Sequence, residues 1–204
     1  MIRFFDIILS LLGILVLSPL FFILMLIILL DSPGNIFYRQ ERIGKNGIPF
    51  NLLKFRSMRP GSDKQGLLTV GSGDLRITKS GIWIRRFKLD ELPQLINVLI
   101  GNMSLVGPRP EVRKYVELYT TEQKKVLDVL PGITDLASIV YSNENELLDS
   151  QENPEDYYVK VIMPHKIQLN MEFIQHRNIW NYFEIICKTI FRISKHPLQT
   201  KNPV

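Results

Sequence analysis

Residues 7–30 read IILSLLGILVLSPLFFILMLIILL, and this stretch decides the fold. It contains no ionisable side chain, and as one helix it would reach about 36 Å, enough to cross a bilayer. A secretory signal peptide is a poor match, because the run is too long and no small-residue cleavage site follows it. A buried core helix is also a poor match, since few soluble folds need so uniform a segment. The pattern therefore favours a membrane segment.

Two features bear on whether this segment crosses the membrane. Ser18-Pro19 lies at its midpoint, where proline removes a backbone donor and kinks a helix. The serine hydroxyl can bond a carbonyl that the proline leaves free. Arg3 precedes the segment and Arg39 and Arg42 follow it, so the positive-inside bias pulls both ends towards the cytoplasm. From the residues alone, a spanning helix and a helix that dips in, breaks at Ser18-Pro19 and returns remain equally open.

Charge is distributed unevenly along the rest of the 204-residue chain. Residues 35–114 contain 15 Lys and Arg against 6 Asp and Glu, whereas residues 115–204 contain 9 against 12. The basic middle indicates an anionic partner such as phosphate, nucleic acid or lipid headgroups. A single cysteine excludes an intrachain disulfide, and three histidines without ligand spacing do not predict a metal centre. We expect a membrane anchor over residues 1–34 and one further domain over residues 35–204.

Local patterns predict the elements of that domain. Residues 36–42 and 49–56 read as two extended segments joined by Gly-Lys-Asn-Gly, a good hairpin signal. The glycine-rich residues 60–74 predict a mobile surface loop. Apolar spacing predicts a helix over residues 92–100, with a proline in its first turn and Gly-Asn as its stop.

Two further helices are expected. One would run from Pro110 to about Leu130 and end at Pro-Gly. Another, near the C-terminus, has an apolar face from Ile179 to Phe191 with basic residues nearby. Such a helix suits a membrane surface, and packing against the core is an equally good interpretation.

Four basic residues fall in patterns that suit phosphate binding. Strand alternation would point Lys54 and Arg56 to the same face. Arg85 lies just upstream of a helix start, and Arg109 sits in a rigid Pro-Arg-Pro loop. Arginine forks and helix N-termini both hold phosphate well. Taken singly, each of these residues is also consistent with a solvated surface or a lipid anchor.

Two carboxylates, Asp90 and Glu91, lie at the N-terminus of the predicted helix over residues 92–100. Magnesium prefers such oxygen ligands and commonly bridges carboxylate and phosphate. With the basic clamps, these residues form the parts of a phosphoryl-transfer site. An N-cap and a first-turn acid explain the same pair without any chemistry. The residues alone indicate a membrane-attached protein that handles anions; an enzyme and a binder of nucleic acid or acidic lipid both fit.

Ordered motifs give the chain a resemblance to a known family. These motifs are Ser18-Pro19 in the apolar hook, Lys-Phe-Arg-Ser-Met at 54–58, Leu-Asp-Glu-Leu-Pro-Gln at 89–94, Met-Ser-Leu-Val-Gly-Pro-Arg-Pro at 103–110 and Pro-Gly-Ile-Thr at 131–134. Together they resemble the bacterial sugar transferases, small monotopic phosphoglycosyl transferases, over about two-thirds of the chain. The fold implied is α+β and mainly helical. It has a re-entrant helix-break-helix anchor, a small cytosolic α/β catalytic domain with a short hairpin, and interfacial amphipathic helices.

The resemblance also implies a reaction. Such enzymes move a sugar 1-phosphate from a UDP-sugar to a polyprenyl phosphate such as undecaprenyl phosphate, release UMP, and need Mg²⁺. Asp90 would be the nucleophile that forms a covalent intermediate, and Glu91 would assist it and help hold the metal. Arg85 would contact phosphate, and Arg109, with Lys54 and Arg56, would help hold the donor. Ser18-Pro19 would be the break of a helix that never crosses the membrane.

The implied location is the cytoplasmic face of the bacterial inner membrane, with both ends of the hook cytoplasmic. Partners would be the UDP-sugar, the polyprenyl phosphate and inner-membrane lipids, with no nucleic acid; self-association as a homo-oligomer is compatible with this set. The chain departs from the family pattern after Thr134, where Asp135 begins a run that continues into an acidic segment at 143–146. A di-N-acetylated deoxysugar is one guess for the transferred sugar.

Overall fold

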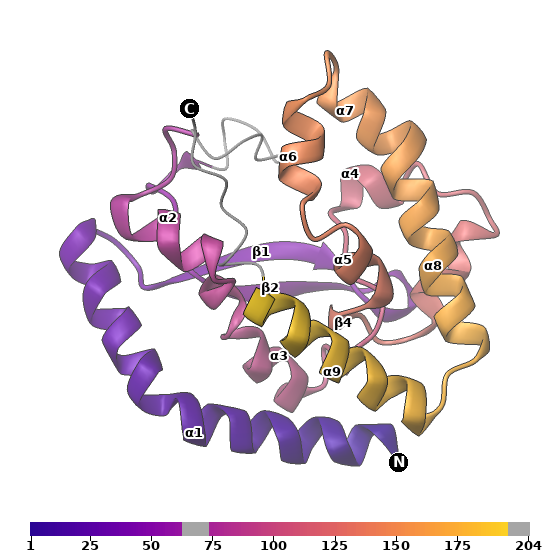
Figure 1. The fold of residues 1–204 in the computed structure, drawn as a ribbon, viewed down its shortest axis with the longest axis horizontal. Helices are drawn as coiled ribbons and strands as arrows, with labels where there is room; N and C mark the ends of the chain where they lie inside the picture. The colour runs from indigo at the N-terminus through magenta and orange to yellow at the C-terminus, as the bar shows by residue number, and fades with distance from the viewer. Residues whose placement is uncertain (63–73, 196–204) are drawn as a thin grey trace.

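The computed structural model describes residues 1–62 and 74–195, and these are mostly helical, with a long apolar N-terminal helix and a small α/β region (Figure 1). The helices are α1 (Ile2–Asp31), α2 (Lys79–Arg86), α3 (Gln94–Ile100), α4 (Arg113–Val116), α5 (Leu136–Val140), α6 (Glu144–Asp149), α7 (Pro154–Tyr157), α8 (Met163–Gln175) and α9 (Ile179–Lys195). Shorter turns of 3-10 helix are η1 (Lys45–Gly47), η3 (Leu89–Glu91) and η4 (Gln123–Asp128), and η5 (Tyr158–Ile162) is a π-turn. The strands are β1 (Phe37–Ile43), β2 (Pro49–Phe55), β3 (Ser104–Val106) and β4 (Gly132–Thr134).

Helix α1 runs through Pro19 without interruption. The Ser18 hydroxyl donates to the Leu15 carbonyl at 2.8 Å, the carbonyl that Pro19 leaves without its usual donor. Figure 1 shows α1 bending, so that its two parts run in different directions. The expectation of a helix-break-helix is therefore wrong in one respect, because the helix bends and does not break. Among the described residues, α1 is the one helix long and apolar enough to cross a membrane.

The N-terminal part of α1 is tied to the α/β region by polar contacts. Arg3 donates to the carbonyls at the C-terminal end of α3, at 2.7 Å from Val98 O and 3.0 Å from Leu99 O. Asp6 is 1% exposed and accepts hydrogen bonds from the Ser104 hydroxyl at 2.9 Å and the Tyr182 hydroxyl at 2.8 Å. This end of the apolar helix is therefore held against β3 and α9.

The C-terminal part of α1 packs on the same unit through apolar and polar contacts. Phe21, Leu24 and Ile28 form a buried cluster with Phe55 and Ile84. At the end of the helix, Asp31 accepts hydrogen bonds from the backbone N–H and the hydroxyl of Ser80 in α2, at 2.8 and 2.7 Å. Both ends of α1 thus contact the part of the chain that follows it.

The predicted hairpin is confirmed. Strands β1 and β2 pair antiparallel, with Phe37 opposite Phe55 and Ile43 opposite Pro49. Asn46 adopts the left-handed region with φ 57° in the connecting turn, a conformation that Asn tolerates better than most residues. Strands β3 and β4 form a second, parallel pair.

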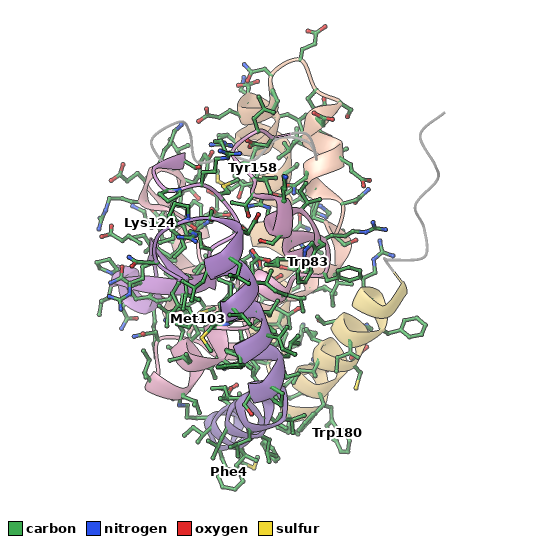
Figure 2. All side chains as sticks on the ribbon, turned by 90° about the vertical axis from the view of Figure 1, so that its left-hand side faces the viewer. Phe4, Trp83, Met103, Lys124, Tyr158 and Trp180 are labelled. Atoms are coloured by element: carbon green, nitrogen blue, oxygen red, sulfur yellow. The ribbon has the colours of Figure 1, made fainter. Side chains whose placement is uncertain are left out.

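The C-terminal helix is also confirmed, and one of its faces packs against the core. Tyr182 and Ile185 of α9 are buried in a cluster with Val106, whereas Trp180 is 81% exposed. In Figure 2, Phe4 of α1 and Trp180 of α9 project from the same lower end of the molecule.

Two other expectations, a helix over residues 110–130 and a mobile loop at 60–74, are not confirmed. A single helix over residues 110–130 is wrong, because the chain forms the short α4 and η4 with a turn between them. In that turn Thr120 and Gln123 exchange hydrogen bonds between their side chains and backbone N–H groups. The expected mobile loop at 60–74 falls largely on residues 63–73, outside the described residues.

Candidate active site

Asp90 and Glu91 lie in η3, where the chain turns from α2 towards α3. Lys88 precedes them in the left-handed region with φ 57°. A non-glycine residue held in that region is strained, and such strain is common at functional sites. The turn places Asp90 inside, at 6% exposure, while Lys88 remains exposed.

Glu91 is held by two cations from distant parts of the chain. Both Arg109 guanidinium nitrogens bind its carboxylate, with Nη1 3.1 Å from Oε2. Lys54 Nζ, on β2, lies 3.7 Å from Glu91 Oε1. The hairpin, η3 and the Pro-Arg-Pro loop therefore meet at this carboxylate.

The charges of the three groups shift one another's pKa values. Burial alone would raise the pKa of Glu91, but Arg109 and Lys54 together hold it well below its usual range. Glu91 in turn raises the pKa of Arg109 further above its already high value. Burial lowers the pKa of Lys54, and the neighbouring carboxylates offset part of that effect. Glu91 is thus a fixed anion at neutral pH.

Asp90 has the opposite character. Burial raises its pKa, Lys54 lowers it, Glu91 raises it, and Arg85 lowers it. In the described part of the chain its carboxylate has no hydrogen-bond partner. Two adjacent acids therefore differ in state, one held by cations and the other with its oxygens free to react. Such a division is typical of sites that assign separate roles to two carboxylates.

Arg109 is positioned by the close approach of two loops. The N–H of Gly107 donates to Thr134 O and the N–H of Gly132 donates to Pro108 O, each at 3.0 Å. A Cβ at Gly132 would lie 2.1 Å from the Gly107 nitrogen, so only glycine permits this approach. The loop bearing Arg109 is thereby fixed beside β4.

Asp135, for which no motif above predicts a role, completes this arrangement. It is fully buried; one carboxylate oxygen accepts the backbone N–H of Arg109 at 3.1 Å and the other accepts the N–H of Ser138 at 2.6 Å. The second bond makes Asp135 the N-cap of α5. An Asp three residues before a Ser at the start of an apolar run was the signal that could have indicated this cap.

The other predicted residues lie elsewhere. The Arg56 guanidinium donates to the carbonyls of Ile28, Ser32 and Pro33 at the end of α1, so the expected common face with Lys54 is wrong. Strand β2 ends at Phe55, and the alternation ends with it. The Arg85 side chain makes no hydrogen bond or ion pair within residues 1–62 and 74–195, and its charge acts on Asp90. Arg85 is thus a cation near the acidic pair that is available to a ligand.

Asp90 and Glu91 are a donor set that fits Mg²⁺. Among the residues that the structure describes, no three His, Cys, Asp or Glu side chains gather as a metal site. Mg²⁺ commonly uses only one or two protein carboxylates together with substrate phosphates. The unpartnered Asp90 carboxylate, with its raised pKa, is a group that a nearby cation would stabilise in its ionised form.

Comparison with known proteins supports one class of chemistry for this site. The family model described as bacterial sugar transferase matches residues 1–196. The chain is 35% identical over 195 residues to the UDP-glucose:undecaprenyl-phosphate glucose-1-phosphate transferase of Escherichia coli strain K12, covering 92% of this chain and 39% of that protein. It is also 35% identical over 191 residues to the UDP-N-acetylgalactosamine-undecaprenyl-phosphate N-acetylgalactosaminephosphotransferase of Aeromonas hydrophila, covering 92% and 42%. The chain therefore spans about two-fifths of the length of these relatives.

Proposed function

Because the chain belongs to the bacterial sugar transferase family, we propose that it transfers a sugar 1-phosphate from a UDP-sugar to undecaprenyl phosphate and releases UMP. This reaction would be the first membrane step of surface glycan or glycoprotein assembly. One observation carries the proposal: a buried, unpartnered Asp90 carboxylate lies beside Glu91, whose charge is held by Arg109 and Lys54. That arrangement supplies a nucleophile and, next to it, cations that can face a diphosphate.

The chemistry proceeds as two displacements at one phosphorus atom. An oxygen of Asp90 attacks the phosphorus that bears the sugar, and the bond from that phosphorus to the bridging oxygen breaks, so that UMP leaves with that oxygen. The product is an aspartyl phosphosugar. A phosphate oxygen of the polyprenyl acceptor then attacks the same phosphorus and releases the Asp90 carboxylate. Splitting the transfer in this way replaces one difficult step with two easier ones.

Basic residues around Asp90 would lower the cost of bringing a polyanion to a carboxylate. Glu91 already orients the Arg109 guanidinium by hydrogen bonding, and it also forms an ion pair with Lys54. Arg85 is near enough to act on the pKa of Asp90, so it could contact the phosphate under attack. Such pre-oriented charges stabilise a transition state without having to reorganise.

Asp90 and Glu91, together with the donor's phosphates, would hold Mg²⁺. When bound, the ion would neutralise charge on the diphosphate and on the departing UMP. Because both carboxylate oxygens of Glu91 already bind Arg109, the metal and the arginine would share this carboxylate.

The contacts of α1 support a membrane arrangement in which both ends of this helix lie on the same side. A straight span of about 30 Å of hydrocarbon would place Arg3 and Asp31 on opposite sides of the bilayer. Yet Arg3 binds the end of α3, and Asp31 binds Ser80 of α2, in one packed unit. We therefore expect residues 1–34 to form a re-entrant anchor bent near Ser18-Pro19, with residues 35–204 on the cytoplasmic face of the inner membrane.

A direct assay tests the proposed reaction. Purified protein, Mg²⁺, undecaprenyl phosphate and a panel of UDP-sugars should yield UMP and a lipid-linked phosphosugar. Release of UDP in place of UMP would mean transfer of the sugar without its phosphate, and it would contradict the proposal. A Phe22→Ala variant, altered on the exposed face of α1, is a suitable control for handling in detergent.

A further inference from the structure

An open pocket of about 420 Å³ lies where the start of α1 meets the turn between α8 and α9. Figure 1 shows the N-terminus of the chain beside the start of α9. The pocket is lined by Met1, Ile2, Arg3, Arg177, Asn178 and Ile179. Two of these residues are arginines and none is acidic, so the pocket is positively charged and suits an anion.

Arg177 is a cation of this pocket that the protein leaves without a partner. Its Nε is buried and has no hydrogen-bond partner. Within residues 1–62 and 74–195 the rest of its guanidinium forms no hydrogen bond or ion pair either. The buried acid of this part of α1, Asp6, directs its Oδ1 to donors on Ser104, Leu105 and Tyr182. Buried polar groups are normally satisfied, so the unpaired guanidinium indicates that a ligand supplies its partner.

Arg3 holds a second guanidinium on the other side of the pocket. Its Nη1 lies 2.7 Å from Val98 O and its Nη2 lies 3.0 Å from Leu99 O. These carbonyls end α3 and carry partial negative charges, which orient the guanidinium without neutralising it. In the part of the chain that the structure describes, Arg3 has no carboxylate partner. Its charge is therefore available to an anion in the pocket.

Exposed aromatic side chains flank the pocket. Phe4 follows Arg3 and is 63% exposed, and Trp180 follows Ile179 and is 81% exposed. Figure 2 shows both rings projecting from the same end of the molecule. Aromatic rings beside basic residues are typical of the headgroup level of a bilayer. In the re-entrant arrangement proposed above, the pocket therefore lies among lipid headgroups.

We infer that this pocket binds the phosphodiester of an anionic phospholipid, with its phosphate oxygens on the guanidinium groups of Arg177 and Arg3. Guanidinium forks bind phosphate oxygens through paired hydrogen bonds. A volume of about 420 Å³ lies within the range of small-ligand sites. A zwitterionic phospholipid also carries an ammonium group, which the two arginines would repel. The inference goes beyond the transfer reaction and rests only on the proposed membrane arrangement.

The phosphate of the acceptor lipid has similar chemistry, but the position of the pocket argues against it. Arg3 contacts the C-terminal end of α3, whereas Asp90 and Glu91 lie before its N-terminal end. The 7 residues of α3 alone separate these positions by roughly 10 Å. An acceptor phosphate has to reach the phosphorus on Asp90, so a phosphate held between the two arginines is too far away.

Native mass spectrometry of the full chain in a neutral detergent tests this inference. The protein is titrated with phosphatidylglycerol and with phosphatidylcholine of the same acyl chains, and the retained lipids are counted at each concentration. The native protein should retain one phosphatidylglycerol with on the order of tenfold higher affinity than phosphatidylcholine, since the choline ammonium opposes the arginine charges. Glycerol phosphate without acyl chains should not displace it at equal concentration, because it lacks the contacts of the chains.

Substitutions locate the preference. Arg177→Gln should remove most of the tenfold difference. Asn178→Asp places an anion in the pocket and should have the same effect. Because Asp also caps a helix, as Asn178 does through the N–H of Asn181, this variant remains informative if Arg177→Gln fails to fold. Lys188→Gln also removes one positive charge from α9, but Lys188 pairs with Glu184 outside the pocket, so this control should keep the preference.

Several outcomes would overturn the inference. Equal retention of the two phospholipids by the native protein would mean that the pocket holds no anionic headgroup. An equal loss of preference in Arg177→Gln and Lys188→Gln would show attraction to general surface charge. Displacement of phosphatidylglycerol by equimolar undecaprenyl phosphate would assign the pocket to the acceptor, and displacement by glycerol phosphate would assign it to a soluble anion. The proposed function fails in a different measurement, through release of UDP in place of UMP, so the two failures are distinguishable.

Discussion

Arg109 binds both carboxylate oxygens of Glu91, with its Nη1 3.1 Å from Glu91 Oε2. This pair joins two segments 18 residues apart and fixes one of two adjacent acids as an anion. Asp90, the other acid, has no such partner in the described structure and has a raised pKa. The contrast explains how neighbouring carboxylates can take separate roles in one reaction.

Replacing the proposed nucleophile should abolish activity. Asp90→Asn should reduce UMP release by on the order of 10⁴-fold or more, because an amide cannot form the acyl phosphate. Asp128→Asn, an exposed change, should leave the rate unaltered. Circular dichroism spectra and Tm measurements check that both variants fold. UMP release by Asp90→Asn at the native rate would rule out this role for Asp90.

The pH dependence of kcat/KM should show the raised pKa of Asp90. Attack needs the ionised carboxylate, so the acid limb should lie above the ordinary aspartate value of about 3.9. Lys54 lowers the pKa of Asp90, so Lys54→Met should move the limb to higher pH. Glu91 raises it, so Glu91→Gln should move the limb to lower pH. Shifts of both variants in the same direction would contradict this account.

Arg56 should matter for stability and not for chemistry. Its guanidinium satisfies carbonyls at the end of α1, where helices leave such groups without partners. Arg56→Gln should lower the free energy of unfolding by about 1.5–3 kcal/mol, measured by urea titration in detergent. UMP release per folded molecule should stay within about twofold of native. If Arg56→Gln instead raised the KM for the donor and left stability unchanged, Arg56 would be a substrate-binding residue.

Asp135 should act on catalysis through Arg109. Asp135→Ala removes acceptors for the N–H groups of Arg109 and Ser138, so we expect about 1 kcal/mol of lost stability from the α5 cap. A less well fixed Arg109 should also lower kcat/KM by about tenfold. Asp135→Asn keeps one acceptor oxygen and should restore part of both losses. If Asp135→Ala lowers only Tm, the residue has a structural role alone.

The membrane arrangement can be tested by labelling. Cysteines introduced at Met1, behind a new initiator, and at Asn35 in a Cys187→Ser background should both react with an impermeant maleimide from the cytoplasmic side. The physical reason is that Arg3 and Asp31 bind the same packed unit. Labelling of the two cysteines from opposite sides would show a spanning helix.

Sequence patterns located part of this site because local signals were sufficient. Short motifs located the turn before α3 that carries Asp90 and Glu91, the hairpin strand with Lys54 and the Pro-Arg-Pro loop. The structure brings these three segments together. Arg56 could not be placed in this way, since its partners lie 23 to 28 residues away at the end of another element. The alternation rule holds only within a strand, and β2 ends one residue before it.

Other errors had signals that were present and missed. Thr120 and Gln123 have the spacing of a capping box, and their reciprocal hydrogen bonds begin a new turn. This pair argued against one continuous helix over residues 110–130. The bend without a break in α1 depends on the Ser18 hydroxyl reaching Leu15 O. The sequence suggested that bond, but whether it would preserve the helix depends on the packing of both parts of α1 against one unit.

The most direct test of the central claim is mass spectrometry of the protein incubated with Mg²⁺ and a panel of UDP-sugars in the absence of acceptor lipid. The account predicts an added phosphosugar on the peptide that contains Asp90, lost on addition of undecaprenyl phosphate and absent from Asp90→Asn. An adduct on another residue, or full product formation by Asp90→Asn with no adduct, would contradict it.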